Sequence, residues 1–539
     1  MIPSCYPEIQ PKEEKTSIGK ILIYTSLSRS LVLFAWLFLF FGFSAAAQQT
    51  ILDQKITISR QHSSLYDALN VVSDKAGCLF IYDSQVLENS KRVKLEADDL
   101  PLKQVLDKLL ANPELAYKVI GKHILIYKAG NSGTEAPISN PAPVPDTIKK
   151  YALIRGNVYD NQSRKPIPFV SVGIEEFNQG TVTNNDGFFI LKVPQEQRNT
   201  LLMLSHIGYM SQSLPLELLD DQHVDIYLER RVISIQEVII RYLDPVTILT
   251  KALEERKLNN NTEPVIMTDF YREGVFKDEN VISFSEAVFK VYKSSFRLGE
   301  YADQVKLMKS RKVQNANSGD TVLLKLKAGI LAGLQLDIVK SLPGFLDPAQ
   351  FQDYTYTYSD IVSYNDQDAY AITFSQNKEI TDALFMGTLY IDNESFAILG
   401  ADFEVNPKYI DKAAPELIQK KSRKLKVKFD KISYSVSYSN YNGKYYLNHA
   451  KSELQLRTRY RNHLSFSKFN TFMEIATCHI DTLNIRRFER QEVIKPDIVF
   501  SDAPYSYDEL FWGEYNFIAP EEKLGDALSK IIGKIEKIE

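Results

Sequence analysis

The feature that most limits the fold of this chain is a succession of stretches in which apolar and polar residues alternate. Alternation with a period of two places one side of a strand in a core and the other side toward solvent. Asn442-Gly443 separates two of these stretches, and this dipeptide is a strong short signal for a β-hairpin. Many such strands in series predict a large antiparallel β-rich domain, either a half-barrel or an open sheet. The stretches are residues 265–276, 281–292, 354–362, 370–375, 384–391, 396–405, 425–438, 445–460 and 464–475.

Length and charge narrow the class of protein further. The 539 residues exceed what one hydrophobic core usually holds, so the sequence predicts several domains. The 30 Tyr and 29 Phe against 2 Trp favour strands, because aromatic side chains pack well on a pleated surface. The formal net charge of -4 argues against a nucleic-acid partner for the chain as a whole. We therefore expect a multidomain, mainly β protein.

An export signal is predicted at the N-terminus. Residues 31–43 form an uncharged apolar run that is too short to span a bilayer comfortably. Small residues follow the run, and Ala45-Ala46-Ala47 fits a signal-peptidase site. We expect residues 1–47 to be a signal peptide cleaved after Ala47, with an uncleaved N-terminal anchor as the alternative. The basic residues ahead of the run are Lys12, Lys15, Lys20 and Arg29.

Residues 50–128 are typical of a small α+β domain with the order βαβ-βαβ-β. Ser64 and Asp99 fit as N-caps of two amphipathic helices, and Gly121-Lys122 predicts a closing hairpin. Through the strings SLYDALNVVSDKAGCLFIYD and LPLKQVLDKLLANPELAYKVIGKHILIYK, the segment resembles the short N-terminal domain of secretins and TonB-dependent transducers. The resemblance implies a periplasmic module that binds a protein partner and has no catalytic role.

A linker and a second domain follow. Residues 129–149 are rich in Pro, Gly and Ser and predict a semi-extended linker. Residues 150–241 contain short strands with regularly spaced turn signals, as in a β-sandwich. The string IRGNVYDNQSRKPIPFVSVGIEEFNQGTVTNNDGFFILKVP, with LSHIGY and IQEVIIR, resembles the carboxypeptidase-D regulatory-like domain, a transthyretin-like sandwich. The resemblance implies an accessory domain without zinc ligands. Residues 184–187 predict a β-turn, because they lack the alternating oxygen ligands of a calcium loop.

Residues 242–539 are expected to form the β-rich C-terminal domain. Helices are predicted at 245–257 and 521–539, and a loop-and-helix region at 328–343 interrupts the strands. The hairpin GTLYIDNESFAILGADFEV resembles the repeating unit of lipoprotein-carrier-like half-barrels, which hold acyl chains in a concave apolar sheet. A membrane barrel is the competing fold, although many charged residues in the strands argue against it. The whole arrangement resembles the "carboxypeptidase-like regulatory domain-containing" envelope proteins of Bacteroidota.

The sequence carries no motif that identifies a catalytic, cofactor or metal site. HExxH, GxSxG and Walker A patterns are all missing from it, so we assign no catalytic residue, cofactor or metal ligand. Cys78 and Cys478 are expected to be buried free thiols, with a disulfide as the alternative, and Cys5 precedes the predicted cleavage site. The basic run at 420–431 could contact anionic lipid, but a solvated helix end leading into an exposed strand is the favoured interpretation.

These observations favour a non-enzymatic envelope binding or adaptor protein in the periplasm or at the outer membrane. We expect an envelope protein partner for residues 50–128 and a lipid-like or protein ligand for residues 242–539. Association with a membrane stays open, as an outer-membrane component related to TonB-dependent uptake or signalling. A hydrolase hidden in the C-terminal domain is a further alternative, because paired carboxylates can come from distant positions.

Overall fold

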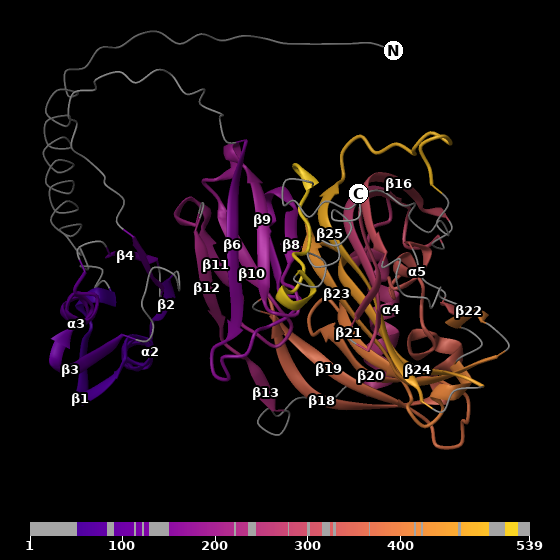
Figure 1. The fold of residues 1–539 in the computed structure, drawn as a ribbon, viewed down its shortest axis with the longest axis horizontal. Helices are drawn as coiled ribbons and strands as arrows, with labels where there is room; N and C mark the ends of the chain where they lie inside the picture. Colours follow the sequence, from indigo (N-terminus) through magenta and orange to yellow (C-terminus); the bar gives the residue numbers. More distant parts are fainter. Residues whose placement is uncertain are drawn as a thin grey trace, which may run out of the picture.

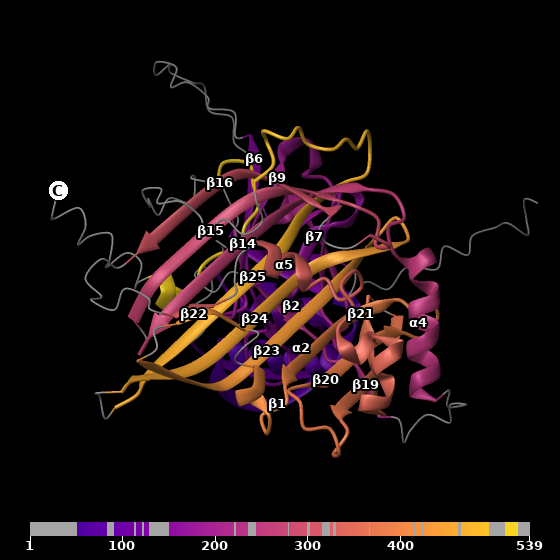
Figure 2. The same ribbon diagram turned by 90° about the vertical axis from the view of Figure 1, so that its right-hand side faces the viewer.

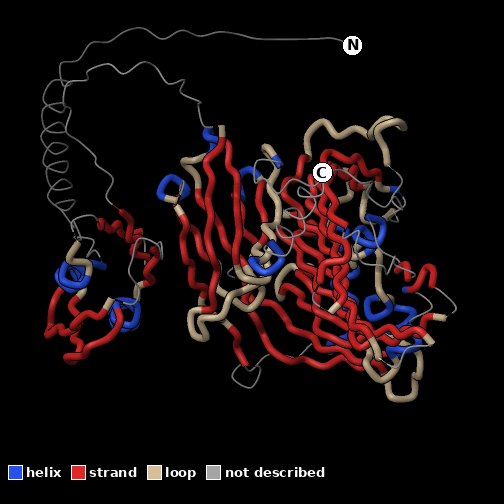
Figure 3. The backbone as a smooth tube through the Cα atoms, in the orientation of Figure 1, coloured by secondary structure: helices blue, strands red, loops and turns tan. Residues whose placement is uncertain are grey.

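The structure is a computed structural model in which strands dominate (Figure 3). The predicted signal peptide and the predicted linker lie outside the residues that it describes. The described residues are 51–82, 91–112, 115–120, 123–128, 150–219, 222–234, 244–278, 280–298, 302–314, 324–326, 330–365, 367–413, 417–421, 424–461, 465–494 and 512–525.

The first module has the predicted order of two βαβ units and a final strand. Strand β1 pairs antiparallel with β3, whereas β5 lies between β2 and β4. Ser64, the last residue of β1, directly precedes α2, at the position predicted for its N-cap. The cap predicted at Asp99 is wrong, because Pro101 precedes α3 without a side-chain cap. Asp99 instead contacts Lys55 at 2.5 Å. The elements are η1 (Ile51–Asp53), β1 (Lys55–Ser64), α2 (Leu65–Ala76), β2 (Leu79–Tyr82), β3 (Arg92–Pro101), α3 (Leu102–Leu109), β4 (Leu115–Ile120) and β5 (His123–Lys128).

The second body is a sandwich of two sheets, as the sequence predicts. One sheet has the order β12-β6-β9 and the other β11-β10-β7-β8, and alternate residues of each strand enter the core between them. The predicted turn at 184–187 is confirmed by the hydrogen bond from Gly187 N to Asn184 O. The strands are β6 (Tyr151–Asp160), β7 (Ser171–Ile174), β8 (Gln179–Val182), β9 (Phe188–Pro194), β10 (Leu201–Ser205), β11 (Gln212–Pro215) and β12 (His223–Leu228).

The third body is a long antiparallel sheet that curls into a half-barrel (Figures 1 and 2). Its strand order is β16-β15-β14-β25-β24-β23-β21-β20-β19-β18-β13. The predicted hairpin at Asn442-Gly443 joins the two longest strands, and both turn residues have positive φ. The strands are β13 (Val232–Ser234), β14 (Val265–Lys277), β15 (Asn280–Lys293), β16 (Gln304–Gln314), β18 (Tyr354–Tyr364), β19 (Gln367–Gln376), β20 (Phe385–Asp392), β21 (Ile398–Val405), β23 (Leu425–Tyr441), β24 (Lys444–Tyr460) and β25 (Ser467–Asp481).

The two faces of the curled sheet are covered by different parts of the chain. Helix α4 (Pro245–Asn259), which Asp244 caps, and residues 330–353 lie on the concave, inner face (Figure 2). We call residues 330–353 the inner segment; it contains α5 (Ile330–Gln335), η7 (Gly344–Leu346) and η8 (Pro348–Asp353). The sandwich packs on the outer face, where β8 and β25 pair at Gln179 and His479. Short strands β17 (Leu324–Leu326) and β22 (Ile418–Lys421) form a separate ribbon.

The exposed strand that we favoured for the basic run at 420–431 is confirmed, because residues 425–431 lie in β23 and Lys426 and Lys428 are exposed. The helix end is not, because Lys420 and Lys421 lie in β22 and Lys424 lies in a turn. The predicted helix at 521–539 is described only as far as Gly525, and residues 522–525 are helical. The remainder of that prediction falls outside the described residues.

Candidate functional site

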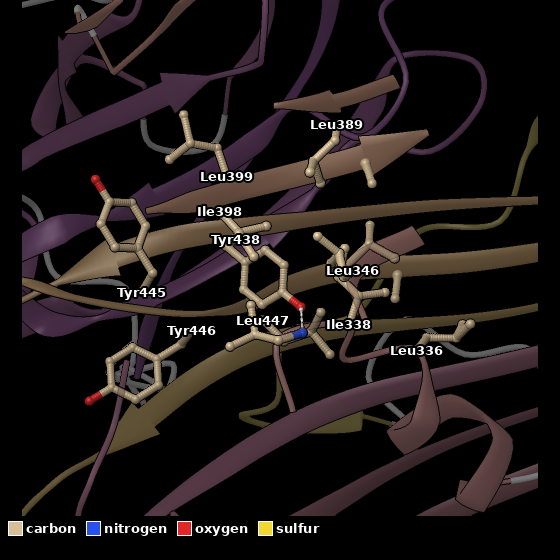
Figure 4. Close-up of a cluster of buried hydrophobic side chains, with 14 of the residues drawn as sticks. Leu336, Ile338, Leu346, Leu389, Ile398, Leu399, Tyr438, Tyr445, Tyr446 and Leu447 are labelled. Carbon is tan, nitrogen blue, oxygen red and sulfur yellow. Dashed lines mark hydrogen bonds between the residues drawn. The ribbon is translucent and has the colours of Figure 1, made fainter. Parts of the chain in front are cut away.

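The inner face of the half-barrel is a continuous apolar surface. Leu389, Leu399 and Tyr438 come from separate strands, and they belong to one buried apolar cluster with Leu336 and Leu346 of the inner segment (Figure 4). All five side chains are buried. The alternation of the strands produces this surface, because every second residue of a curled sheet points toward its concave side. The inner segment therefore fills the half-barrel in this conformation.

Phe345 is the aromatic anchor of the inner segment. It is fully buried, and its ring stacks on Phe374 with centroids 4.1 Å apart. Phe403 and Phe385 meet the same ring edge-on, at centroid distances of 5.0 and 6.0 Å. Such aromatic packing stabilises beyond the burial of area alone. The inner segment is thus held mainly by apolar contacts.

Two buried ion pairs hold the inner segment a few residues before Phe345, at Asp337 and Lys340. Lys340 Nζ lies 2.5 Å from Asp303, and Lys293 Nζ lies 2.8 Å from Asp337. Tyr438 donates its hydroxyl hydrogen to Asp337 at 2.8 Å and accepts from Val339 N at 3.1 Å, the bond drawn in Figure 4. Desolvation of buried ions offsets most of their mutual attraction. The cluster therefore specifies where the segment docks more than it stabilises the docking.

The charge state of the cluster follows from its partners. Burial by itself would raise the pKa of Asp337, but Lys293 and the hydroxyl of Tyr438 outweigh burial and lower that pKa. Burial would likewise lower the pKa of Lys293, but Asp337 and Asp303 outweigh it and raise the pKa. Both groups are therefore ionised at neutral pH. They form an ion pair rather than a neutral hydrogen-bonded pair.

The stability of the fold should depend on pH through Asp269, which lies on β14 near this cluster. Burial raises the pKa of Asp269 to about 7, against the opposing effects of Thr477 and Lys293. A carboxyl group whose pKa is higher in the folded state stabilises the fold at low pH, and this stabilisation is lost as the pH rises through the folded value. For Asp269, this contribution to the free energy of unfolding is lost between about pH 4 and pH 7. The loss amounts to at most about 1.4 kcal/mol per pH unit.

We therefore expect Asp269→Asn to become stabilising relative to the wild type as the pH rises from 5 to 8. Urea unfolding at each pH measures the difference in free energy of unfolding. Asp382→Asn, at an exposed position before β20, is the control for the removal of a surface carboxylate. Parallel curves for the wild type and Asp269→Asn would contradict the prediction.

A strap from the C-terminal region lies between the outer face and the sandwich. We give the name strap to residues 512–525. Trp512 is fully buried against Phe270 of β14, with ring centroids 5.4 Å apart. On the sandwich side, Asn184 Nδ2 donates to Ala519 O at 3.1 Å, and Thr181 Oγ1 donates to Phe517 O at 3.0 Å. The strap therefore joins the second and third bodies.

Beneath the strap lies a second buried ion network on the outer face. Arg272 Nε donates to Glu474, and Arg272 Nη2 lies 3.0 Å from Glu521 of the strap. The imidazole Nε2 of His449 is 2.7 Å from the other oxygen of Glu474. Burial alone would raise the pKa of Glu474, but Arg272 and His449 outweigh it and hold the pKa below its usual range. Glu474 is therefore a buried anion that depends on Arg272.

The joint between the sandwich and the outer face also contains a cavity of about 470 Å³. Phe169 and His449 stack on its wall with centroids 4.5 Å apart, and Phe169 has a φ of +62°. On the sandwich side, Asp160 accepts a hydrogen bond from Tyr209 at 2.9 Å and contacts Arg230 at 2.5 Å. Ligand sites often lie at such domain junctions. The cavity thus lies between the sandwich and the outer face, whereas the inner face is filled by the inner segment.

The sequence indicated no catalytic, cofactor or metal residue, and it did not indicate the buried ion networks around Asp337 and Glu474 either. Among the described residues, no group of three or more His, Cys, Asp or Glu side chains is arranged to hold a metal ion. No helix within the described part of the chain is long and apolar enough to cross a membrane.

Cys78 and Cys478 are buried free thiols, as expected, so the disulfide alternative was wrong. Burial raises the pKa of the Cys78 thiol to about 11.

Two family models match the chain, in the predicted order. The secretin and TonB N-terminus short domain matches residues 78–129, and the CarboxypepD_reg-like domain matches residues 154–240. These matches confirm both domain resemblances drawn from the sequence. Neither description is that of a catalytic domain. No curated protein sequence matches the chain.

Several solved structures match the chain at low identity and low TM-score. A LolA superfamily protein from Nitrosomonas europaea is 11% identical, with a TM-score of 0.17, over 47% of this chain and 99% of its own. An outer-membrane lipoprotein-sorting type of domain from Vibrio parahaemolyticus is 10% identical, with a TM-score of 0.20, over 44% and 93%. A DUF1329 family protein from Desulfovibrio piger is 9% identical, with a TM-score of 0.20, over 45% and 96%. We draw no functional conclusion from likenesses of this size.

Proposed function

We propose that this chain is a non-enzymatic binding and adaptor protein of the cell envelope. Residues 50–128 dock a partner protein, and residues 242–539 hold a lipid-like ligand on the inner face of the half-barrel. The observation that carries the proposal is the inner face itself, a continuous apolar surface that one short segment of the same chain fills. The matches to the secretin and TonB short domain and to the regulatory-like domain support an envelope location and an interaction role.

The inner segment is suited to exchange with a ligand. Its buried ion pairs contribute little net stability, because desolvation offsets their attraction. Its remaining hold comes from apolar side chains such as Phe345 and Leu346, whose place an acyl chain could take. Binding of a lipid-like ligand then requires the segment to move off the inner face. The free energy of that step limits the affinity.

Loosening the inner segment should therefore increase lipid binding. Phe345→Ala removes the anchoring ring, at a cost of about 3–5 kcal/mol, and leaves a cavity on the inner face. We expect this variant to bind a fluorescent fatty acid more tightly than the wild type. Native mass spectrometry of both purified proteins should show co-purifying lipid, more of it in the variant. Phe189→Ala is the matched control, because Phe189 is equally buried but lies in the sandwich core.

Two results would contradict the lipid proposal. One is a purified wild type free of lipid together with equal fatty-acid binding by the two Phe→Ala variants. The other is lipid binding that increases as much in Phe189→Ala as in Phe345→Ala, since this would reflect general loosening.

The protein partner of residues 50–128 needs its own test. Cross-linking in cells with the full chain should capture an envelope protein through these residues. Carbonate extraction of membranes then tests whether the chain is embedded in the outer membrane or bound at its surface.

A further inference from the structure

Five cationic side chains meet in register at one end of the outer face. Lys428 on β23 is directly opposite Arg457 on β24, and Arg457 is directly opposite Lys468 on β25. In the next row, Lys426 is opposite Arg459. Directly opposite residues point to the same side of a sheet, so the five side chains share one surface. We call these five residues the cationic rows.

This arrangement is unfavourable within the isolated sheet. Like charges directly opposite each other destabilise a strand pair, yet three such pairs occur here in a chain whose net charge is -4. Asp430 is bound to Arg457 at 2.6 Å and compensates one cation. Lys426, Lys428 and Lys468 are exposed. The surplus positive charge therefore faces outward, where an external anion can neutralise it.

Two further features point to a ligand at this surface. The Nε hydrogen of Arg459 is buried and has no hydrogen-bond acceptor among the described residues. Phe466, which is 42% exposed, lies at the edge of the rows with its ring centroid 4.8 Å from the Arg459 guanidinium. Cations around an exposed aromatic ring are typical of surfaces that bind anionic lipid, because the ring enters the interface while the cations meet the headgroups.

We propose that the cationic rows and Phe466 dock the chain on an anionic membrane surface through the phosphates of its lipid headgroups. An acidic protein would match the charge, but it would not require the exposed ring. The rows lie on the outer face, away from the inner segment. The proposal is therefore independent of the lipid-like ligand proposed for the inner face, and either can fail alone.

Vesicle co-sedimentation of the purified full chain tests this docking. We expect binding to phosphatidylcholine vesicles that contain phosphatidylglycerol, weakening as salt is added, and little binding to phosphatidylcholine alone. Each cation near an anionic bilayer strengthens binding about fivefold, so Lys426→Gln/Lys428→Gln/Arg459→Gln should weaken it by about a hundredfold. Phe466→Ser should weaken binding with less effect on its salt dependence. Lys103→Gln/Lys378→Gln, at two exposed lysines elsewhere, should change binding little.

The stability of the same variants separates docking from a structural role. Removing like-charge pairs should leave the thermal midpoint of the triple variant unchanged or higher, while vesicle binding falls. A triple variant that binds vesicles as the wild type does would overturn the proposal. So would polyglutamate binding as tight as vesicle binding and unaffected by Phe466→Ser, since that result would assign the surface to an acidic protein.

Discussion

Arg272→Leu is expected to lower the free energy of unfolding by about 3–5 kcal/mol, because it leaves Glu474 buried without its cation. Both side chains are completely buried, and His449 is the other side chain bonded to Glu474. The pKa of Glu474, now held low by Arg272, would rise, and the variant would gain stability as the pH falls. Denaturant unfolding at two pH values measures both effects.

The double variant Arg272→Leu/Glu474→Gln distinguishes loss of a charge partner from loss of packing. We expect it to recover part of the stability, because it no longer buries an uncompensated anion. Arg457→Leu is the matched control, since Arg457 has good hydrogen-bond geometry with Asp430 but lies at the surface. Its effect should be small by comparison. Equal losses in the single and the double variant would show that the pair acts through shape rather than charge.

Trp512→Ala is expected to release the strap and so uncouple the sandwich from the half-barrel. Trp512 is fully buried between Phe270 and Phe517, with the guanidinium of Arg311 over its ring at 4.9 Å. Truncating a buried tryptophan costs about 3–5 kcal/mol. The other apolar anchors of the strap, Phe517, Ile518 and Ala519, belong to the same buried cluster as Trp512. Because the cavity left by Trp512 loosens that cluster, we expect the loss to appear as local opening before global unfolding.

Cys478 reports this opening directly. Its thiol lies 3.3 Å from Asn516 O of the strap and is buried in the wild type. In a Cys5→Ser background, a thiol reagent should modify Cys478 much faster in Trp512→Ala than in the wild type. The rate at Cys78, buried in the first module, should not change. Phe189→Ala serves as the control, because it weakens the sandwich core without touching the strap. Similar acceleration at Cys78 and Cys478 would indicate general unfolding instead.

Much of the architecture could be predicted from local patterns. The alternation over residues 265–276 and 281–292 corresponds to β14 and β15, and Asn442-Gly443 corresponds to the turn between β23 and β24. Strand β16 was missed, although it forms one edge of the half-barrel. Its sequence QVKLMKSRKVQ is rich in lysine, as edge strands often are, and therefore lacks a clear apolar periodicity.

The candidate sites could not be predicted in the same way. Arg272 and Glu474 are 202 residues apart, and nothing in either local sequence indicates that a distant strap buries them. The cationic rows illustrate the same limit. The basic run at 420–431 was visible, but its alignment with Arg457 and Lys468 depends on the register of three strands. A single-residue slip would turn those side chains to the opposite face.

By itself, the sequence determined most of the strands of the half-barrel, the hairpin turn at Asn442-Gly443, and the two domain types that precede the half-barrel. These properties follow from period, turn chemistry and family resemblance, all of which act over short stretches of chain. Only the tertiary structure decided which face of the long sheet is filled by the inner segment and which is covered by the strap and the sandwich. The physical reason is that an alternating strand defines two faces but not what covers them. What covers each face here comes from segments that are distant in the sequence.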